Sequence, residues 1–240
     1  MEKLADKRVV VLGGTSGIGL AVARALLEHG AQVIAASRSA QRGEQAREAL
    51  GGRVSFEQVD VQDREALGAL FERLAPFDHL VNSATGGERE TGPFLEMNLD
   101  GFVGSFRKLW GYVNSVQLAA PRMSRSGSIV LVGGALSRKC RPGMSAHSTV
   151  GNAVEGFCRA VAPEIAPIRI NVVAPGLIDT PMFGHLEGAG RESFFRGATA
   201  QHVIQRPGRP EEIADGILFL LRNEFITGTT LDVDGGSLLP

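Results

Sequence analysis

The sequence lacks the features that mark several large classes of protein. Its 240 residues include only two cysteines, Cys140 and Cys158, which cannot form a disulfide framework and do not have metal-ligand spacing. Acidic and basic residues nearly balance, at 26 and 25, so the charge indicates neither a nucleic-acid partner nor an anionic membrane. The longest apolar runs, such as residues 129–132, are far shorter than a membrane span. The first eight residues lack the apolar stretch of a secretory signal, so a reducing cytoplasm is the expected location.

Histidine and basic residues are not concentrated in a way that predicts a metal site or a binding tract. Apart from the one at position 147, the histidines are dispersed, at His29, His79, His185 and His202. Basic residues gather once, at Arg138, Lys139 and Arg141. Three charges indicate a local patch rather than a tract that binds a polyanion. We therefore expect no metal and no nucleic acid.

Strand-like and helix-like segments alternate along the whole chain. Arg8–Leu12 is an apolar, β-branched run, and residues 18–28 follow with the spacing of an amphipathic helix that ends at Gly30. Further strands are expected at residues 32–36, 54–59, 80–81, 128–132, 168–173 and 230–233, and a polar-faced helix at 40–50. This alternation predicts βαβ crossovers, and so a doubly wound Rossmann-type α/β fold with about seven parallel strands and helices on both faces. No linker or repeat divides residues 1–240, which we expect to form one domain.

A glycine-rich segment joins the first expected strand to the first expected helix. Its residues are Gly13, Gly14, Thr15, Ser16, Gly17, Ile18 and Gly19. Glycines allow a tight turn and a close approach of the backbone to a pyrophosphate, while the helix N-terminus offers free N–H groups. A glycine run alone could equally be a plain strand–helix turn. Its position at the start of a βαβ unit favours a dinucleotide site.

The end of the second strand indicates which dinucleotide binds. An acidic residue there would bind the ribose 2′-hydroxyl, whereas an arginine accommodates a 2′-phosphate. The chain has Ser37 and Arg38 at this place and no carboxylate beside them. A hydroxyl followed by a guanidinium suits a phosphate dianion, although Arg38 could also be an ordinary solvated arginine. We expect NADP(H) rather than NAD(H).

With these motifs in order, the chain resembles the short-chain dehydrogenase/reductase family along its whole length. The glycine segment is similar to that family's Thr-Gly-x-x-x-Gly-Ile-Gly, with Leu12 where threonine is usual. Asp60-Val61 resembles its adenine-contacting pair, and Asn82-Ser83-Ala84-Thr85 half keeps its Asn-Asn-Ala-Gly. Residues 171–182 resemble the loop over the nicotinamide and its phosphates, and 226–236 the C-terminal strand. The resemblance implies cofactor contacts at Ser83, Ala84, Thr85, Pro175, Gly176, Ile178 and Thr180.

The resemblance also implies where the chemistry should lie, and there the sequence departs from the family. The family uses a tyrosine as acid/base, a lysine four residues later, a serine about 13 residues earlier and an asparagine in a preceding helix. The corresponding residues are His147, Gly151, Gly134 and Lys108. Asn98 is an alternative to Lys108 but lies ten residues too early. Tyr112 is the only tyrosine, the other lysines are Lys3, Lys7 and Lys139, and none stands four residues after His147, so the usual groups are absent rather than displaced.

His147 and Lys108 are the candidate catalytic residues. An imidazole has a reference pKa of about 6.5 and could deliver the proton that a phenol normally supplies. Lys108 could supply the missing cation from the neighbouring helix. Each also has a structural interpretation, as a hydrogen-bonded histidine at a helix start and as a solvated helix lysine.

Three functions follow from this combination. The first is an oxidoreductase that transfers hydride between NADP(H) and a carbonyl or alcohol with non-standard proton delivery. The second is a non-catalytic NADP(H) sensor or subunit. The third is a non-redox lyase or isomerase that uses His147 as acid/base. We favour the first.

Residues 183–205 are expected to form a lid over a small-molecule pocket. Within them, Phe183, Leu186, Phe194 and Phe195 suggest an apolar or ring-bearing substrate, although such residues can also simply pack the lid. The family resemblance implies a homodimer or homotetramer, with the helices that carry Lys108 and His147 buried between subunits.

Overall fold

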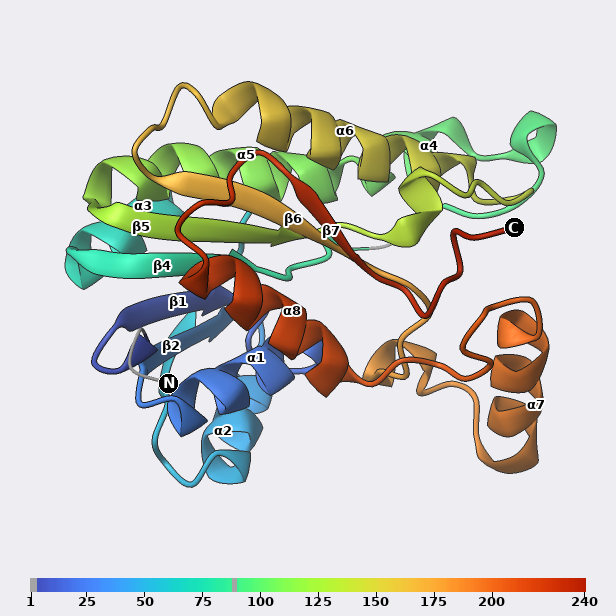
Figure 1. Cartoon of the computed structure of the whole chain (residues 1–240), viewed down its shortest axis with the longest axis horizontal. Helices are drawn as coiled ribbons and strands as arrows, with labels where there is room; N and C mark the ends of the chain where they lie inside the picture. The colour runs from blue at the N-terminus through green and yellow to red at the C-terminus, as the bar shows by residue number, and fades with distance from the viewer. Residues whose placement is uncertain (1–3, 88–89) are drawn as a thin grey trace.

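Seven parallel strands form a single sheet at the centre of the molecule (Figure 1). The computed structural model describes residues 4–87 and 90–240. The strand order is β3-β2-β1-β4-β5-β6-β7. The strands are β1 (Arg8–Leu12), β2 (Gln32–Ser37), β3 (Ser55–Gln58), β4 (Phe77–Asn82), β5 (Met123–Val132), β6 (Arg169–Pro175) and β7 (Thr230–Val233). The doubly wound, seven-stranded fold that the alternation predicts is confirmed.

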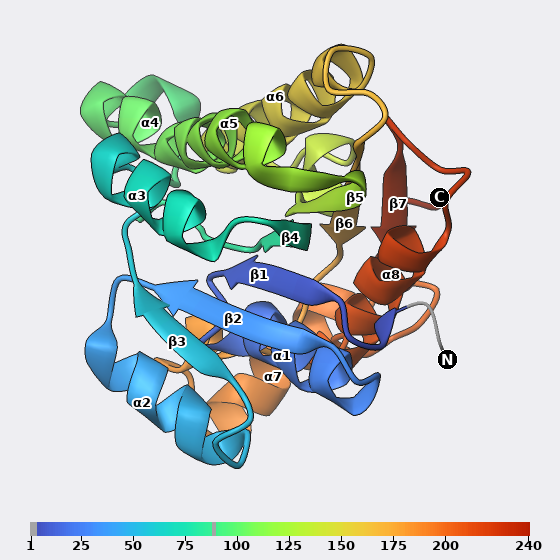
Figure 2. The ribbon, with the colours of Figure 1, turned by 90° about the vertical axis from the view of Figure 1, so that its left-hand side faces the viewer.

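Helices cover both faces of this sheet (Figures 1 and 2). One face carries α3 (Arg64–Leu74), α5 (Arg107–Ala119) and α6 (Ser145–Val161), with α4 (Leu99–Ser105) beside them; the other carries α1 (Gly17–Glu28), α2 (Ala40–Ala49) and α8 (Pro210–Arg222). The helix α7 (Gly188–Thr199) stands apart from both layers. Short 3₁₀ turns lie at η2 (Phe94–Glu96), η3 (Ala120–Arg122), η4 (Ala135–Ser137) and η5 (Pro181–Phe183).

The central strands are apolar on both sides because helices bury both faces. Every residue of β6 is buried, and so are four of the five residues of β1. Such strands read as continuous apolar runs rather than as alternating patterns. The core therefore divides into two clusters: Phe71 and Tyr112 lie in the one under α3, α5 and α6, and Val22 and Leu218 in the one under α1 and α8.

Two strands are longer than the sequence pattern predicts. The pattern marks only residues 80–81 and 128–132, whereas β4 begins at Phe77 and β5 at Met123. The added part of β4 contains Asp78 and His79. Because these residues are polar, a search for apolar runs does not identify this part as a strand. Asp78 accepts a hydrogen bond from the backbone N–H of Arg8 at 3.0 Å and pairs with Lys7, while His79 Nδ1 accepts from the N–H of Ser128 at 3.1 Å. The partners on neighbouring strands satisfy these groups, so the strand tolerates them.

The strand order reverses direction between β1 and β4, which is where ligands bind in open α/β sheets. The chain leaves β1 toward β2 and β3 and then returns to place β4 on the other side of β1. Because all strands are parallel, their carboxyl ends meet at one edge of the sheet. The segments that follow β1 to β6 are therefore brought together there.

Among the residues that the structure describes, no helix has both the length and the apolar character needed to cross a membrane.

Burial of His79 predicts a loss of stability in mild acid. Its side chain is 5 % exposed, and burial lowers its pKa from 6.5 to about 4, an effect that neighbouring Asp78 only partly opposes. Between these two pH values the unfolded chain protonates this ring and the folded chain does not. The contribution of His79 to the free energy of unfolding is complete above pH 6.5. It falls by about 3 kcal/mol as the pH approaches 4.

Urea unfolding at pH 7 and pH 4.5 measures this contribution. We expect His79→Gln to lose about 2–3 kcal/mol less free energy of unfolding than the wild type over this interval. The control, His185→Gln, changes an exposed histidine and should behave as the wild type. Equal losses in His79→Gln and the wild type would show that this ring is not the acid-labile group.

Candidate active site

A cavity of about 1090 Å³ opens at the carboxyl edge of the sheet. It is lined by the segments that follow β1 to β6, together with parts of α5, α6, the lid and the C-terminal segment. The residues expected to bind the cofactor all line it: Gly13, Thr15, Ser16, Gly17, Ile18, Gly19, Ser37, Arg38, Asp60, Val61, Ser83, Ala84, Thr85, Pro175, Gly176, Ile178 and Thr180. Their arrangement around one cavity supports the interpretation as a dinucleotide site, and their individual contacts stay a prediction.

The glycine segment turns tightly beneath the start of α1. Gly13 has a φ of +77°, a conformation that L side chains rarely adopt. A Cβ at Gly19 would lie 2.1 Å from the Gly13 carbonyl oxygen, so only glycine allows this approach of helix to strand. The N-cap Ser16 makes no side-chain capping bond, and the described first turn of α1 holds no acidic residue. The N–H groups of this turn are thus available to a phosphate, which fits a pyrophosphate at this helix end.

Cationic and hydroxyl groups surround the end of β2. Arg38 stands 4.0 Å from the Asp60 carboxylate, and both side chains are well exposed. Arg42, one helical turn further on, lines the same part of the cavity and was not anticipated from the sequence. The feature of the sequence that could have identified Arg42 is its position in the first turn of the helix that follows Arg38. Two guanidinium groups and the Ser37 hydroxyl fit a 2′-phosphate.

Lys108 enters the cavity from α5. Its Nζ donates a hydrogen bond to the Gly133 carbonyl oxygen at 3.1 Å and lies 5.7 Å from the centre of the Tyr112 ring. Tyr112 is fully buried, and its hydroxyl donates to the Val132 carbonyl oxygen at 2.8 Å. The only tyrosine in the sequence therefore anchors α5 to the end of β5 and does not line the cavity.

His147 enters the same cavity from the first turn of α6. Its Nδ1 is buried, and the rest of the residue is partly exposed. The helices α5 and α6 lie side by side on one face of the sheet (Figure 1). The two candidate catalytic residues thus line one cavity, as expected. Asn98, the alternative to Lys108, is exposed and caps α4 by accepting from the N–H of Asp100 at 2.9 Å.

The expected lid carries a packed aromatic cluster. The rings of Phe183, Phe194 and Phe195 have centroids 5.4–5.5 Å apart. Phe183 and Phe194 line the cavity, whereas Phe195 is buried inside the lid and Leu186 does not reach the cavity. Arg191 on α7 holds the base of the lid through an ion pair with Asp179.

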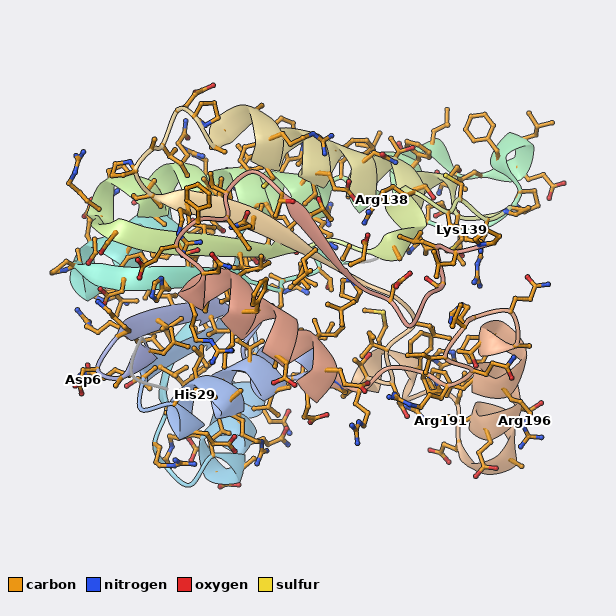
Figure 3. The ribbon with its side chains drawn as sticks, viewed as in Figure 1. Asp6, His29, Arg138, Lys139, Arg191 and Arg196 are labelled. Atoms are coloured by element: carbon orange, nitrogen blue, oxygen red, sulfur yellow. The ribbon has the colours of Figure 1, made fainter. Side chains whose placement is uncertain are left out.

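A basic corner, which we define as Lys139, Arg141 and His202, lies at the lid end of the cavity. The sequence marks Lys139 and Arg141 as part of a local basic patch and His202 as a dispersed histidine, and it does not predict that the three residues meet. The reason is tertiary: the loop after β5 and the segment after α7 fold against each other, and Arg141 Nη2 lies 3.3 Å from His202 Nε2. Arg138 turns away from the cavity and pairs with Asp232 and Glu155. Figure 3 shows Lys139 beside the C-terminal segment, and Arg191 and Arg196 on the lid.

No group of three His, Cys, Asp or Glu residues in the described parts of the chain is arranged to hold a metal ion.

Comparison with known proteins identifies the relatives of this chain. A family model described as enoyl-(acyl carrier protein) reductase matches residues 13–237. The 3-oxoacyl-(acyl-carrier-protein) reductase of Mus musculus is 34% identical, over 96% of this chain and 98% of that protein. The short-chain dehydrogenase/reductase ATR9 of Stachybotrys chlorohalonatus is 32% identical over the full length of both. The chain belongs to the short-chain dehydrogenase/reductase family. This is a family of oxidoreductases, and its members bind a nicotinamide cofactor.

Solved structures of the family agree with this assignment. A small-chain dehydrogenase in complex with NADPH is 31% identical, with a TM-score of 0.86 over 98% of this chain and all of the other. The MalC reductase/Diels-Alderase from Malbranchea aurantiaca is 27% identical, with a TM-score of 0.91 over 100% of this chain and 99% of the other. The family fold is therefore present from end to end.

The glycine that stands where the family resemblance places a lysine is locked in by packing. A Cβ on Gly151 would lie 2.9 Å from the Cβ of Ser137 in η4. Ser137 is itself held there, because its hydroxyl lies within hydrogen-bond distance of the buried Glu155 carboxylate and of the Gly134 carbonyl oxygen and can donate its single proton to either. By contrast, a Cβ on Gly134 would meet nothing within 4 Å. A side chain therefore fits at position 134, whereas at position 151 it would force Ser137 or the helix to shift.

This contact predicts opposite effects for two glycines of the same helix. We expect Gly151→Ala to lower the free energy of unfolding by about 1–3 kcal/mol, because the added methyl group overlaps Ser137. Gly156→Ala has open space around it and should raise it by about 0.5–1 kcal/mol through helix propensity. Urea unfolding of both variants measures the difference.

A double-mutant cycle tests whether Ser137 is the obstacle. Ser137→Gly should recover part of the loss in Gly151→Ala, giving a favourable coupling energy between the two positions. If the effects of the two substitutions on the free energy of unfolding are additive, Ser137 is not the obstacle at position 151.

Proposed function

We propose that the chain is an NADP(H)-dependent oxidoreductase that transfers hydride between the cofactor and a small apolar or ring-bearing carbonyl or alcohol, with His147 in place of a tyrosine as proton donor. One observation carries the proposal. A single cavity runs from the glycine segment and Arg38 at one end to Lys108, His147 and the lid at the other. A dinucleotide and a substrate can therefore lie against each other within it.

Three observations support NADP(H) over NAD(H). Ser37, Arg38 and Arg42 line the cavity where β2 ends. The one carboxylate lining the described cavity, Asp60, stands at the end of β3 and not of β2, beside Arg38. A 2′-phosphate there would gain charge-assisted bonds, whereas a 2′-hydroxyl would find no carboxylate at the strand end. The related dehydrogenase in complex with NADPH is consistent with this choice.

The proton would come from the imidazole of His147. NADP(H) supplies or accepts the hydride when bound. Because Nδ1 of His147 is buried, we assign proton transfer to Nε2, which as part of an imidazolium donates its proton to the substrate oxygen and becomes neutral. Lys108 is held to the Gly133 carbonyl oxygen and places a positive charge near the substrate oxygen. That charge favours the negative charge that develops on this oxygen during reduction.

The lid supports the apolar part of the proposed substrate. Met144, Phe183 and Phe194 line the same cavity as His147. Two aromatic rings and a thioether offer contacts for a flat or ring-bearing compound.

A non-redox enzyme is the second candidate function. It is favoured by the likeness to a protein described as both a reductase and a Diels-Alderase, and by a cavity lined by His147 without any tyrosine. Product formation without change in NADPH absorbance at 340 nm would separate it from the first. NADPH binding without any turnover would favour the third function, a sensor or non-catalytic subunit.

Exposed apolar residues on α4 and α5 support a homodimer or homotetramer. Leu99 and Val103 are each 69 % exposed and Trp110 is 58 % exposed. Association through this surface would bury them. A cytoplasmic location remains the expectation from the composition.

Replacing Arg38 should change the choice between the two cofactors. We expect Arg38→Gln to weaken NADPH binding by about 10-fold or more while leaving NADH binding nearly unchanged, because only NADPH carries the 2′-phosphate. Isothermal titration calorimetry measures both. The control, Arg24→Gln, removes an exposed arginine of α1 and should preserve the NADPH affinity. No loss of NADPH affinity in Arg38→Gln would contradict the proposed 2′-phosphate site.

Replacing His147 should slow reduction without removing the cofactor. We expect His147→Phe to lower kcat by about 10²–10⁴-fold, the usual contribution of general acid catalysis, and Lys108→Met to lower it less. Both should retain the wild-type Kd for NADPH. NADPH oxidation over a panel of small ring-bearing ketones and aldehydes gives kcat.

His29→Phe is the matched control, because His29 lies at the end of α1 away from the lid (Figure 3). Its kcat should equal that of the wild type. Unchanged kcat in both His147→Phe and Lys108→Met would show that the proton comes from elsewhere.

A further inference from the structure

The basic corner is the part of the cavity that neither the fold nor the proposed hydride transfer explains. Arg141 lies on the loop between η4 and α6, His202 follows α7, and Lys139 lies two residues before Arg141. All three line the same cavity as His147, which is six residues beyond Arg141. The corner is thus at the substrate end, whereas the groups suited to the cofactor phosphates lie at the glycine segment and the end of β2.

The charges of this corner are not neutralised by the protein. Within residues 4–87 and 90–240, neither Lys139 nor Arg141 forms an ion pair with a carboxylate. Lys139 Nζ donates instead to the Leu239 carbonyl oxygen at 2.9 Å. Other arginines of this region do find acidic partners: Arg138 pairs with Asp232, and Arg191 with Asp179. The contrast marks the corner as the place where positive charge faces the cavity.

His202 reports the positive potential at this corner. It is 6 % exposed, and its pKa is lowered, first by burial and then by the charges of Arg141 and Lys139. Since a guanidinium has only donors, the contact with Arg141 makes His202 Nε2 the acceptor and the ring neutral. Asp234 opposes this shift. Its carboxylate, however, accepts from Gly236 N, Leu238 N and the Ser237 hydroxyl at 2.9–3.0 Å.

The lining of the cavity contains no acidic group that could occupy this corner. Among its described residues the one carboxylate is Asp60, at the opposite end. A neutral substrate would leave the positive charges of Arg141 and Lys139 without an anionic partner. A substrate with an oxyanion would bind the guanidinium through charge-assisted bonds, which are stronger than hydrogen bonds between neutral groups.

We propose that the substrate of this cavity carries an oxyanion, a carboxylate or a phosphate, which binds to Arg141 and Lys139 beside His202. The apolar body of the same molecule lies between Met144 and Phe194, and its reacting carbon lies toward His147. This assignment rests on the proposed function and adds the charge class of its substrate. The oxyanion would orient the substrate, because it is attached at a fixed distance from the reacting group.

Binding of unreactive ring compounds tests the charge preference without requiring turnover. The probes are 2-naphthoate, 2-naphthamide and 2-naphthyl phosphate, which share one ring system and differ in charge. Isothermal titration calorimetry is run on the NADP⁺-saturated protein and again without cofactor. We expect 2-naphthoate or 2-naphthyl phosphate to bind at least about 10-fold more tightly than 2-naphthamide. The tighter of the two anions identifies the source of the oxyanion.

Arg141→Gln should abolish this preference, bringing the affinities for the anions and the amide within about threefold of one another. The matched control is Arg196→Gln, an exposed arginine on the lid helix outside the cavity lining (Figure 3), which should keep the wild-type ratio. The proposal is wrong if neither anion binds more tightly than the amide, or if Arg141→Gln keeps the preference. Failure of NADP⁺ itself to bind would instead contradict the proposed function, while the cofactor-free titrations would still decide the charge preference.

Discussion

The parallel direction of all seven strands is the constraint on which the rest of this structure depends. Parallel pairing needs a crossover after every strand, and these crossovers place helices on both faces and every strand end at one edge. The reversal between β1 and β4 opens that edge. Gly13 and Gly19 then allow α1 to begin directly at the strand end, so that its N-terminus faces the cavity. The cofactor end of the site is thus a consequence of topology and of two small residues.

The proposed catalytic end of the cavity depends on a second close contact, between α6 and the turn η4. Ser137 lies against Gly151, and Glu155 holds it there from the buried side of the helix. This packing places His147 at the cavity and at the same time leaves no room for a long side chain one turn later. Lys108 brings a positive charge to the same region from α5. The proposed proton donor His147 and the packed Gly151 therefore stand at positions where the family resemblance implies a tyrosine and a lysine, although the fold is shared.

Positive charge has two different uses in this molecule. Arg138 and Arg191 tie loops to the body through carboxylates, Asp232 and Asp179. Arg141, in contrast, lines the cavity, and among the described residues its guanidinium pairs with no carboxylate and lies 3.3 Å from the ring nitrogen of His202. Structural ion pairs at exposed positions contribute little stability each, so their main effect here is to set loop positions. A cation kept without a carboxylate at the end of a cavity is the arrangement that favours an anionic ligand.

The sequence by itself determined the alternation of strands and helices, the family and the glycine segment, because these depend on residues that are close together along the chain. It also identified His147 and Lys108 as cavity residues through their place in that pattern. Only the tertiary structure decided that Arg141 meets His202, 61 residues away, and that Ser137 blocks position 151. Such contacts arise where separate loops converge at the edge of the sheet, and no local periodicity records which of them will touch.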